Sequence, residues 1–120
     1  MNVTLPFVSV VIPMRNEAGS IDSCLASVLA QDYPADRIEV ILVDGQSDDG
    51  TPNAVRAAAR GDARVKVLEN PHRIVPTAMN IGIRAARGEI IARVDGHTHI
   101  APDYLRVGVE TLQRLLLLPQ

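Results

Sequence analysis

Short apolar runs alternate with amphipathic segments along this chain of 120 residues. The runs at residues 8–12, 39–43 and 89–94 are almost continuously apolar and rich in β-branched side chains, which predicts strands buried on both faces. Residues 64–68 alternate between apolar and charged side chains, which predicts a strand with one solvated face at the edge of a sheet. The apolar pattern therefore predicts one edge strand and three buried ones.

The amphipathic segments between these runs predict helices. After the first run, apolar residues recur at helical spacing on one face, namely Ile21, Cys24, Leu25, Val28 and Leu29. We expect Ser20 to cap this helix and Tyr33-Pro34 to stop it.

Proline, threonine and glycine mark the ends of further helices. A second helix is expected to begin with Thr51 as its cap and Pro52 at its first position, and to close near Gly61. A third is expected at residues 76–87 and a fourth at 103–118. Strands and helices then alternate, which predicts an α/β fold, an open and mostly parallel sheet with helices on both faces.

The C-terminal part of this pattern lacks a partner. Leu115–Leu118 are apolar on all sides of the predicted helix, and such a segment is normally buried. The run at residues 89–94 is also too apolar for a free sheet edge. We therefore expect a truncated fold, the N-terminal part of a larger domain, which would self-associate through Leu115–Leu118 when alone.

Composition and charge exclude several classes of protein. The net charge of −2 and the near absence of aromatic residues argue against nucleic-acid binding. Cys24 is the only cysteine, so we expect a core residue in a reducing compartment rather than a disulfide. No run reaches the roughly 20 apolar residues that span a bilayer, and the features of a signal peptide are lacking. These observations predict a cytoplasmic protein.

Acidic residues stand where three of the predicted strands end. Glu17 lies in the loop after the first strand, Asp44 ends the second strand, and Asp95 follows the last one. The carboxyl ends of parallel strands share one edge of the sheet, where α/β proteins bind ligands. The sequence therefore predicts an acidic site that combines these three residues. For each acid alone, an ordinary turn or cap role stays open.

The loop after the first strand contains a single glycine, so neither the dinucleotide fingerprint nor the P-loop is present. A diphosphate bound at this edge would need positive charge from another source. A divalent cation held by Asp95 and a neighbouring side chain would supply that charge.

Four motifs follow one another around these strand ends. They are residues 8–17 (VSVVIPMRNE), 43–51 (VDGQSDDGT), 80–89 (NIGIRAARGE) and 93–97 (RVDGH). Together they resemble family 2 glycosyltransferases of the GT-A fold, and most of all the succinoglycan-type bacterial polysaccharide glucosyltransferases. The resemblance covers residues 8 to about 105. It implies that residues 1–120 are the nucleotide-sugar-binding part of one GT-A domain.

The resemblance implies roles for the residues that match. Pro13, Arg15 and Glu17 would line the nucleoside pocket, and Arg15 stands where relatives often carry an aromatic residue that stacks on the base. Asp44 would contact the nucleoside. Gly45 replaces the second acid that many relatives carry, which leaves the choice of nucleotide open.

Residues 95–97 occupy the position of the Asp-x-Asp motif that binds the metal and the sugar diphosphate in this family. His97 replaces the second aspartate, and a neutral imidazole can ligate manganese. The resemblance therefore implies Mn²⁺ or Mg²⁺ bound by Asp95 and His97. Asn80 would also bind the substrate, although a polar stripe on a helix is more often simply solvated.

These roles imply an inverting, metal-dependent glycosyltransferase that moves a sugar, glucose from UDP-glucose, to a polysaccharide or a lipid-linked acceptor. The general base on the acceptor side would lie beyond residue 120. In a longer parent protein the expected location is the inner face of the membrane.

Two other functions fit parts of the pattern. The chain could be a non-catalytic nucleotide-binding fragment that needs the missing C-terminal part or a partner. A phosphoacceptor domain with Asp44 as the acceptor would need paired acids after the first strand and a lysine late in the sheet. Glu17 is alone, and the only lysine, Lys66, lies on the edge strand, so this second alternative fits poorly.

Overall fold

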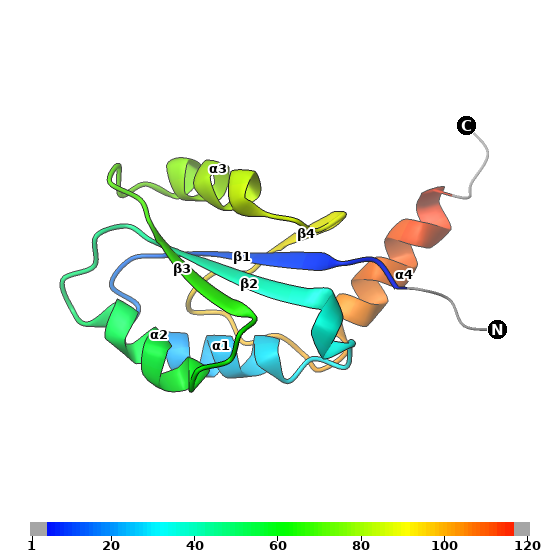
Figure 1. The fold of residues 1–120 in the computed structure, drawn as a ribbon, viewed down its shortest axis with the longest axis horizontal. Coiled ribbons are helices and arrows are strands. Elements are labelled where there is room, and N and C mark those ends of the chain that lie inside the picture. Colours follow the sequence, from blue (N-terminus) through cyan, green and yellow to red (C-terminus); the bar gives the residue numbers. More distant parts are fainter. Residues whose placement is uncertain (1–4, 117–120) are drawn as a thin grey trace.

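The computed structural model describes residues 5–116, which form one sheet of strands between layers of helices (Figure 1). The elements follow one another along the chain as β1 (Val8–Met14), α1 (Ile21–Leu29), the short 3-10 helix η1 (Ala35–Arg37), β2 (Ile38–Asp44), α2 (Thr51–Ala59), β3 (Val65–Glu69), α3 (Val75–Ala85), β4 (Ile90–Arg93) and α4 (Tyr104–Leu116). Strands and helices alternate, as the apolar pattern predicts.

The four strands form a single parallel sheet in the order β3-β2-β1-β4. β1 pairs with β2 along its whole length, and on its other side it pairs with β4 from Val8↔Ile90 to Val11↔Arg93. β3 lies at one edge of the described sheet, as its alternating pattern predicts. β4 lies at the other edge and is only partly buried, whereas the apolar run at residues 89–94 predicted a buried strand. The parallel α/β fold expected from the sequence is therefore confirmed.

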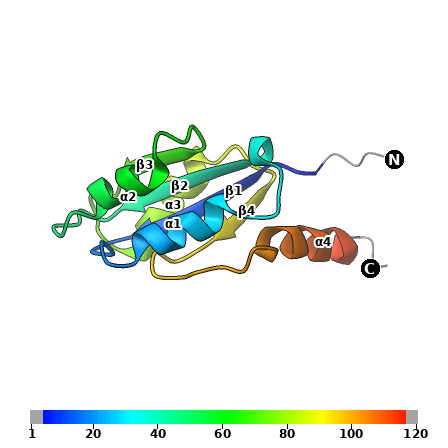
Figure 2. The ribbon, with the colours of Figure 1, turned by 90° about the horizontal axis from the view of Figure 1, so that it is seen from below.

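Helices cover both faces of the sheet, α1 and α2 on one face and α3 on the other (Figures 1 and 2). Successive side chains of a strand point to opposite faces. Val10 and Ile12 of β1 accordingly belong to the core under α1 and α2, which Leu105 and Val109 of α4 also join. Val11 belongs to the smaller core under α3. Burial on both faces explains why the central strands are almost continuously apolar.

α3 packs closely on β1. A Cβ atom at Gly82 would overlap with the side chain of Val11, so only glycine permits this approach. The helix begins one residue earlier than predicted and ends at Ala85, because Ala86 already has extended backbone angles (φ −69°, ψ 135°). This packing brings the amino end of α3 next to the carboxyl ends of β1 and β2.

The caps of α1 and α2 differ from the prediction. Ser20 precedes α1, but its hydroxyl contacts the carbonyl and carboxylate of Glu17 and the carbonyl of Gly96 instead of capping the helix. At α2 the cap is Gly50, with φ of 89°, and Thr51 is the first helical residue. Thr51 Oγ1 accepts a hydrogen bond from the backbone N–H of Glu17 at 2.9 Å. Both hydroxyls thus hold the loop after β1.

A buried carboxylate lies near the amino end of the sheet. Glu39 of β2 is 1% exposed and accepts hydrogen bonds from Ser9 Oγ at 2.6 Å and from the backbone N–H of Arg87 at 2.7 Å. The side-chain nitrogens of Lys66 and Arg87 lie 3.3 Å from its Oε1. Burial alone would raise the pKa of Glu39, but these hydrogen bonds together outweigh burial and lower the pKa. The cluster therefore holds an ionised carboxylate inside the fold.

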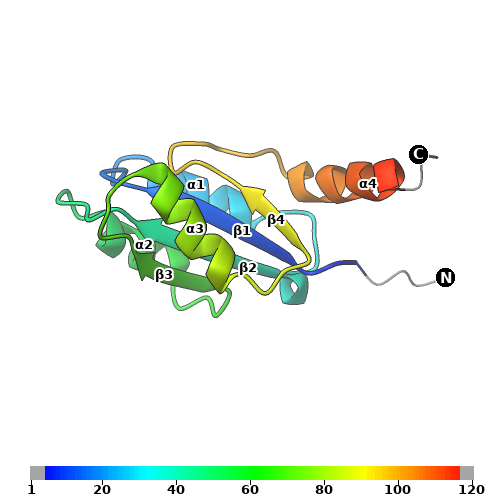
Figure 3. The same cartoon turned by 90° about the horizontal axis from the view of Figure 1, so that it is seen from above.

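β4 and α4 leave apolar side chains exposed at the far end of the molecule, where α4 projects past the sheet (Figures 2 and 3). The exposed apolar residues there are Ile91, Val107, Leu112, Leu115 and Leu116. Leu117 and Leu118, also part of the predicted apolar face, lie outside the described residues. Within residues 5–116, no helix has the length and apolar character required to cross a bilayer.

Candidate functional site

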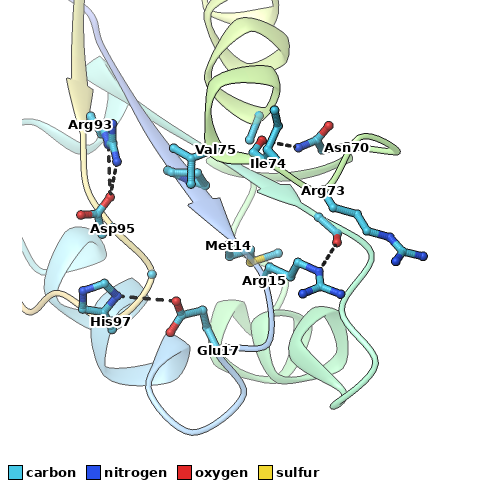
Figure 4. A pocket seen from close by; sticks show the side chains of 14 residues that line it. Met14, Arg15, Glu17, Asn70, Arg73, Ile74, Val75, Arg93, Asp95 and His97 are labelled. Atoms are coloured by element: carbon cyan, nitrogen blue, oxygen red, sulfur yellow. Dashed lines mark hydrogen bonds and ion pairs between the residues drawn. The ribbon is translucent and has the colours of Figure 1, made fainter.

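The carboxyl ends of the strands surround an open pocket of about 290 Å³, which the amino end of α3 closes on one side (Figure 4). Segments after all four strands contribute residues to its wall. Five of the residues singled out from the sequence lie here, namely Pro13, Arg15, Glu17, Asp95 and His97. The structure thus brings the first loop and the segment after β4 to one place, as the strand-end argument predicts.

An ion pair occupies the β4 side of the pocket. Arg93 Nε and Nη2 each donate a hydrogen bond of 3.1 Å to Asp95 Oδ1 (Figure 4). Arg93 is the last residue of β4, and in an extended backbone the side chains of residues i and i+2 point to the same face. Both side chains are about half exposed, at 52% for Arg93 and 44% for Asp95. The pair is therefore accessible to a ligand.

Glu17 and His97 face each other on the lower side of the pocket (Figure 4). Glu17 Oε1 lies 3.5 Å from His97 Nδ1, and Ser20 Oγ lies 3.1 Å from Glu17 Oε2 and 3.3 Å from the carbonyl oxygen of Gly96. Ser20 thereby holds the Glu17 carboxylate toward the segment after β4. Glu17, which the resemblance assigns to the nucleoside pocket, is placed by the structure beside the expected metal ligand.

Cys24 lies beneath the same segment. Its side chain is buried, and Sγ donates a hydrogen bond of 3.4 Å to the carbonyl oxygen of Asp95. Burial raises the pKa of Cys24 to about 11, so that the thiol stays protonated at neutral pH. Cys24 is a core residue, as predicted from its position on the apolar stripe.

Two arginines enclose Gly45 on the opposite side of the pocket. Arg15 Nε donates a hydrogen bond of 3.0 Å to the Gly45 carbonyl oxygen. A Cβ atom at position 45 would lie 3.1 Å from the Arg73 carbonyl oxygen and 3.3 Å from Arg15 Cδ. A side chain at this position would therefore be crowded unless these neighbours shift by a few tenths of an ångström, which favours glycine here.

Asp44 is not among the residues that line this pocket, and its contact with a nucleoside stays a prediction. Its side chain is buried and accepts hydrogen bonds from the backbone N–H of Ser47 at 3.1 Å and from Ser47 Oγ at 2.6 Å. The carboxylate thus stabilises the loop between β2 and α2, which is the turn role that the sequence leaves open.

Asn80 also lies outside the pocket. It is exposed on α3, away from the residues that form the wall at the amino end of this helix. The structure therefore does not bring Asn80 together with the other predicted site residues, and a solvated polar stripe accounts for its position.

The loop after β3, which the sequence motifs did not mark, forms another part of the wall. Asn70 is fully buried, donates from Nδ2 to the Ile74 carbonyl at 2.8 Å and accepts from the backbone N–H of His72 at 3.1 Å. Arg73 has a left-handed backbone (φ 65°), and its Nε lies 2.7 Å from Gln46 Oε1. The sequence could have predicted this, because a strand parallel to its neighbours, as β3 is, ends at the same edge of the sheet.

The side chains at the Asp95 end fit a divalent cation of the Mn²⁺ or Mg²⁺ type. Asp95 offers carboxylate oxygens and His97 an imidazole nitrogen, both suitable for Mn²⁺. Within residues 5–116 no group of three or more His, Cys, Asp or Glu side chains is arranged to hold a metal by itself. Mg²⁺-type sites often use one or two carboxylates and take their other ligands from water and substrate phosphates. The donor set thus matches a cation shared with a diphosphate.

Comparison with known sequences identifies relatives of the whole described region. The family model described as Glycosyl transferase family 2 matches residues 9–116. Glycosyltransferase AglE of Haloferax volcanii is 39% identical over 93% of this chain and 37% of its own length. Succinoglycan biosynthesis protein ExoA of Rhizobium meliloti is 34% identical over 85% of this chain, which supports the succinoglycan-type resemblance. The chain spans about a third of the length of these curated relatives.

Solved structures share the fold. Mannosyltransferase PcManGT from Pyrobaculum calidifontis, in complex with GDP-Man and Mn²⁺, superposes with a TM-score of 0.79 at 38% identity, covering 85% of this chain and 31% of that one. TarS from S. aureus, in complex with UDP, superposes with a TM-score of 0.81 at 27% identity, covering 90% of this chain and 32% of that one. These matches show that the parallel sheet is part of a GT-A fold.

Four ordered motifs, a parallel sheet with the pocket at its carboxyl edge, and a family match over residues 9–116 agree with one another. The chain belongs to glycosyl transferase family 2.

Proposed function

We propose that this chain is the donor-binding part of an inverting, metal-dependent glycosyltransferase and that its pocket holds a nucleotide-diphospho-sugar. The proposal is carried by the pocket in which Asp95 and His97 lie together with Arg15, Arg73 and Arg93. A cation and guanidinium groups are what a diphosphate needs to neutralise its charge. The similarity to PcManGT, solved with GDP-Man and Mn²⁺, supports the same conclusion.

In this proposal Asp95 and His97 hold the cation on the β4 side of the pocket. When bound, the metal stabilises the negative charge that develops on the departing diphosphate. Arg73, with its Nε on a neutral amide oxygen, has further donors for the phosphate oxygens. Charge-assisted hydrogen bonds strengthen as further negative charge develops on the departing diphosphate, which favours the leaving group over the intact donor.

The nucleoside would lie over the opposite part of the pocket, where Pro13, Arg15 and Gly45 form the wall. The Gly45 carbonyl fixes Arg15 Nε at 3.0 Å, so the guanidinium has a defined orientation. A guanidinium plane can stack on a nucleobase, which makes Arg15 the candidate for that contact. Asn80 stays a predicted substrate contact without structural support.

The donor proposed is UDP-glucose, and the acceptor a polysaccharide or lipid-linked saccharide. Similarity to ExoA supports polysaccharide synthesis, and the TarS complex supports a uridine nucleotide. The general base that accepts the proton of the acceptor hydroxyl would come from the remainder of a longer protein. A lipid-linked acceptor would place that protein in the cytoplasm at the inner face of a membrane.

A second candidate function is nucleotide binding without transfer. It is favoured by the fact that the chain spans only about a third of the length of its relatives. Both candidates require the same donor pocket, and they differ in whether the chain alone forms a glycosylated product.

Calorimetric titration of UDP, GDP and dTDP with Mn²⁺ and with EDTA tests donor binding. We expect one of these nucleotides to bind with Mn²⁺ and to lose at least about tenfold in affinity when Asp95→Asn removes the charged ligand. Asp36→Asn is the matched control, since Asp36 is exposed in η1 before β2, at the other end of the sheet. Equal affinity in EDTA and in Mn²⁺ would contradict the proposal.

A further inference from the structure

Arg93 differs from the other arginines of the pocket in its hydrogen-bond partner, and the proposed function does not explain this difference. Arg15 and Arg73 direct their Nε atoms to neutral oxygens, the Gly45 carbonyl and the Gln46 side-chain amide. Arg93 instead directs two nitrogens to one oxygen of Asp95. Of the three arginines that line the pocket, Arg93 alone has a carboxylate partner among residues 5–116.

The carboxylate that Arg93 holds is the one proposed to bind the cation. Asp95 Oδ1 accepts both hydrogen bonds, so one of the two carboxylate oxygens is occupied by a positive group. A divalent cation on the same oxygen would stand within a few ångströms of the guanidinium, and like charges at that distance repel. Metal binding through Oδ1 and the Arg93–Asp95 pair therefore compete with each other.

We propose that Arg93 alternates between two partners, Asp95 in the metal-free site and the diphosphate of the donor once the metal is bound. The inference rests on the proposed function, since it requires that metal and diphosphate share this pocket. Arg93 lines the pocket itself, so its guanidinium stays near the diphosphate position after it leaves Asp95. A long, flexible side chain that is half exposed can make this exchange without any movement of β4.

The strength of the pair suits an exchange of this kind. Exposed ion pairs change an equilibrium by at most about fivefold, so Mn²⁺ can displace Arg93 at small cost. A guanidinium placed on a diphosphate makes charge-assisted hydrogen bonds, whose loss typically reduces affinity about tenfold or more. Arg93 therefore weakens the binding of metal alone and strengthens the binding of metal and diphosphate together. Such coupling makes the site take up both ligands jointly.

Two binding measurements on the purified chain test the inference. The first follows free Mn²⁺ by electron paramagnetic resonance in the absence of nucleotide, and the second titrates UDP calorimetrically at saturating Mn²⁺, or GDP if GDP is the nucleotide that binds. For Arg93→Ala we expect Mn²⁺ alone to bind about two- to fivefold more tightly. The same variant should bind the nucleotide at least about tenfold more weakly. Effects of opposite sign from one substitution are what a merely structural role would not give.

Arg106→Ala is the matched control, because the Arg106 side chain is 41% exposed and pairs with Asp32 at 2.9 Å outside the pocket. It should change neither affinity. Arg93→Lys keeps the positive charge, so its affinity for Mn²⁺ without nucleotide should be close to that of the unmodified protein.

The outcomes separate this inference from the function on which it rests. Unchanged or weaker Mn²⁺ binding by Arg93→Ala, or unchanged nucleotide binding, overturns the exchange while the donor pocket stands. Failure of the unmodified chain to bind any of the three nucleotides with Mn²⁺ contradicts the proposed function and overturns the exchange with it.

Discussion

At the scale of single residues, two departures from the usual motifs shape this pocket. Gly45 stands where many relatives carry an acid, and its neighbours Arg15 and Arg73 crowd the place where a Cβ atom would lie. His97 stands where an aspartate is usual, and Glu17 lies 3.5 Å from its Nδ1. A histidine that ligates a metal commonly has its other ring nitrogen held by a carboxylate, so Glu17 is placed to orient His97.

Substitution of the two loop histidines tests which one faces the metal. His97 lines the pocket, whereas His99 is exposed and does not. His97→Ala should weaken Mn²⁺ binding by about tenfold or more, and His99→Ala should leave it unchanged. Measurement of free Mn²⁺ at fixed pH gives both values. A larger loss with His99→Ala would mean that this loop presents the other histidine to the metal.

The buried Glu39 predicts a pH-dependent contribution to stability. Its pKa is lowered in the fold, so its stabilising contribution is complete above the pKa of an unfolded glutamate, about 4.3, and is lost as pH falls through the folded-state pKa. Glu39→Gln should lower the free energy of unfolding by about 1–3 kcal/mol at pH 7. The difference from the unmodified protein should shrink as pH falls from about 5 to 3.

Urea denaturation at several pH values measures this effect. Glu89→Gln serves as the control, because Glu89 lies near the same end of the sheet but outside the buried cluster. A difference between Glu39→Gln and the unmodified protein that persists unchanged to pH 3 would show that the charge of Glu39 contributes nothing.

At the scale of elements, the sequence predicted the strands well because burial on both faces leaves a direct record in composition. Residues 8–12 and 39–43 became the centres of β1 and β2, and the alternating run became the edge strand β3. The cap of α2 was predicted one residue too late. Thr51 Oγ1 instead accepts a hydrogen bond from the backbone N–H of Glu17. This contact joins residues 34 positions apart, so a local sequence pattern cannot predict it.

The difference between local patterns and contacts set by the folded chain also explains which site residues were predicted and which were missed. Glu17 and Asp95, in the segments after β1 and β4, could be brought together from topology alone. Asp44 could not be assigned, since its engagement with Ser47 depends on the conformation of the loop between them. The loop after β3 was missed because an edge strand was not expected to contribute, although all parallel strands end at one edge.

The loop after β3 should depend on Asn70. This side chain is fully buried and bridges the Ile74 carbonyl and the His72 N–H. Asn70→Ala would therefore remove the acceptor of the His72 N–H and one of the three hydrogen bonds to the Ile74 carbonyl. We expect a loss of about 1–3 kcal/mol in unfolding free energy and weaker nucleotide binding, since Arg73 loses its support. Asn53→Ala, at an exposed position of α2, should change neither quantity. Unfolding curves and calorimetry distinguish the two variants.

At the scale of the whole molecule, the described part has the proposed donor pocket at one end and an exposed apolar surface at the other. Ile91 of β4 and Leu116 of α4 mark this surface, at 40% and 81% exposure. Edge strands and contiguous apolar faces are places where other polypeptide packs. We therefore expect the remainder of a longer protein to cover them.

Without that remainder, the 120-residue chain should bind a donor but transfer no sugar. The pocket contains residues suited to a nucleoside, a cation and a diphosphate, and the proposed general base lies elsewhere. Incubation with UDP-glucose, Mn²⁺ and saccharide acceptors should give no glycosylated product. Metal-dependent transfer of glucose by the chain alone would show that residues 1–120 contain a complete active site.

The exposed apolar face should also make the chain self-associate. Leu115 and Leu116 end the described part of α4, and each would remove apolar surface from water on contact with a second copy. Sedimentation velocity should show dimers or larger species that dissociate on dilution. The double variant Leu115→Glu with Leu116→Glu should be monomeric, because paired negative charges cannot be buried at such a contact. Gln113→Glu adds a charge at an exposed polar position of the same helix and should leave association unchanged. Sedimentation of the chain as a monomer at all concentrations would contradict self-association through this face.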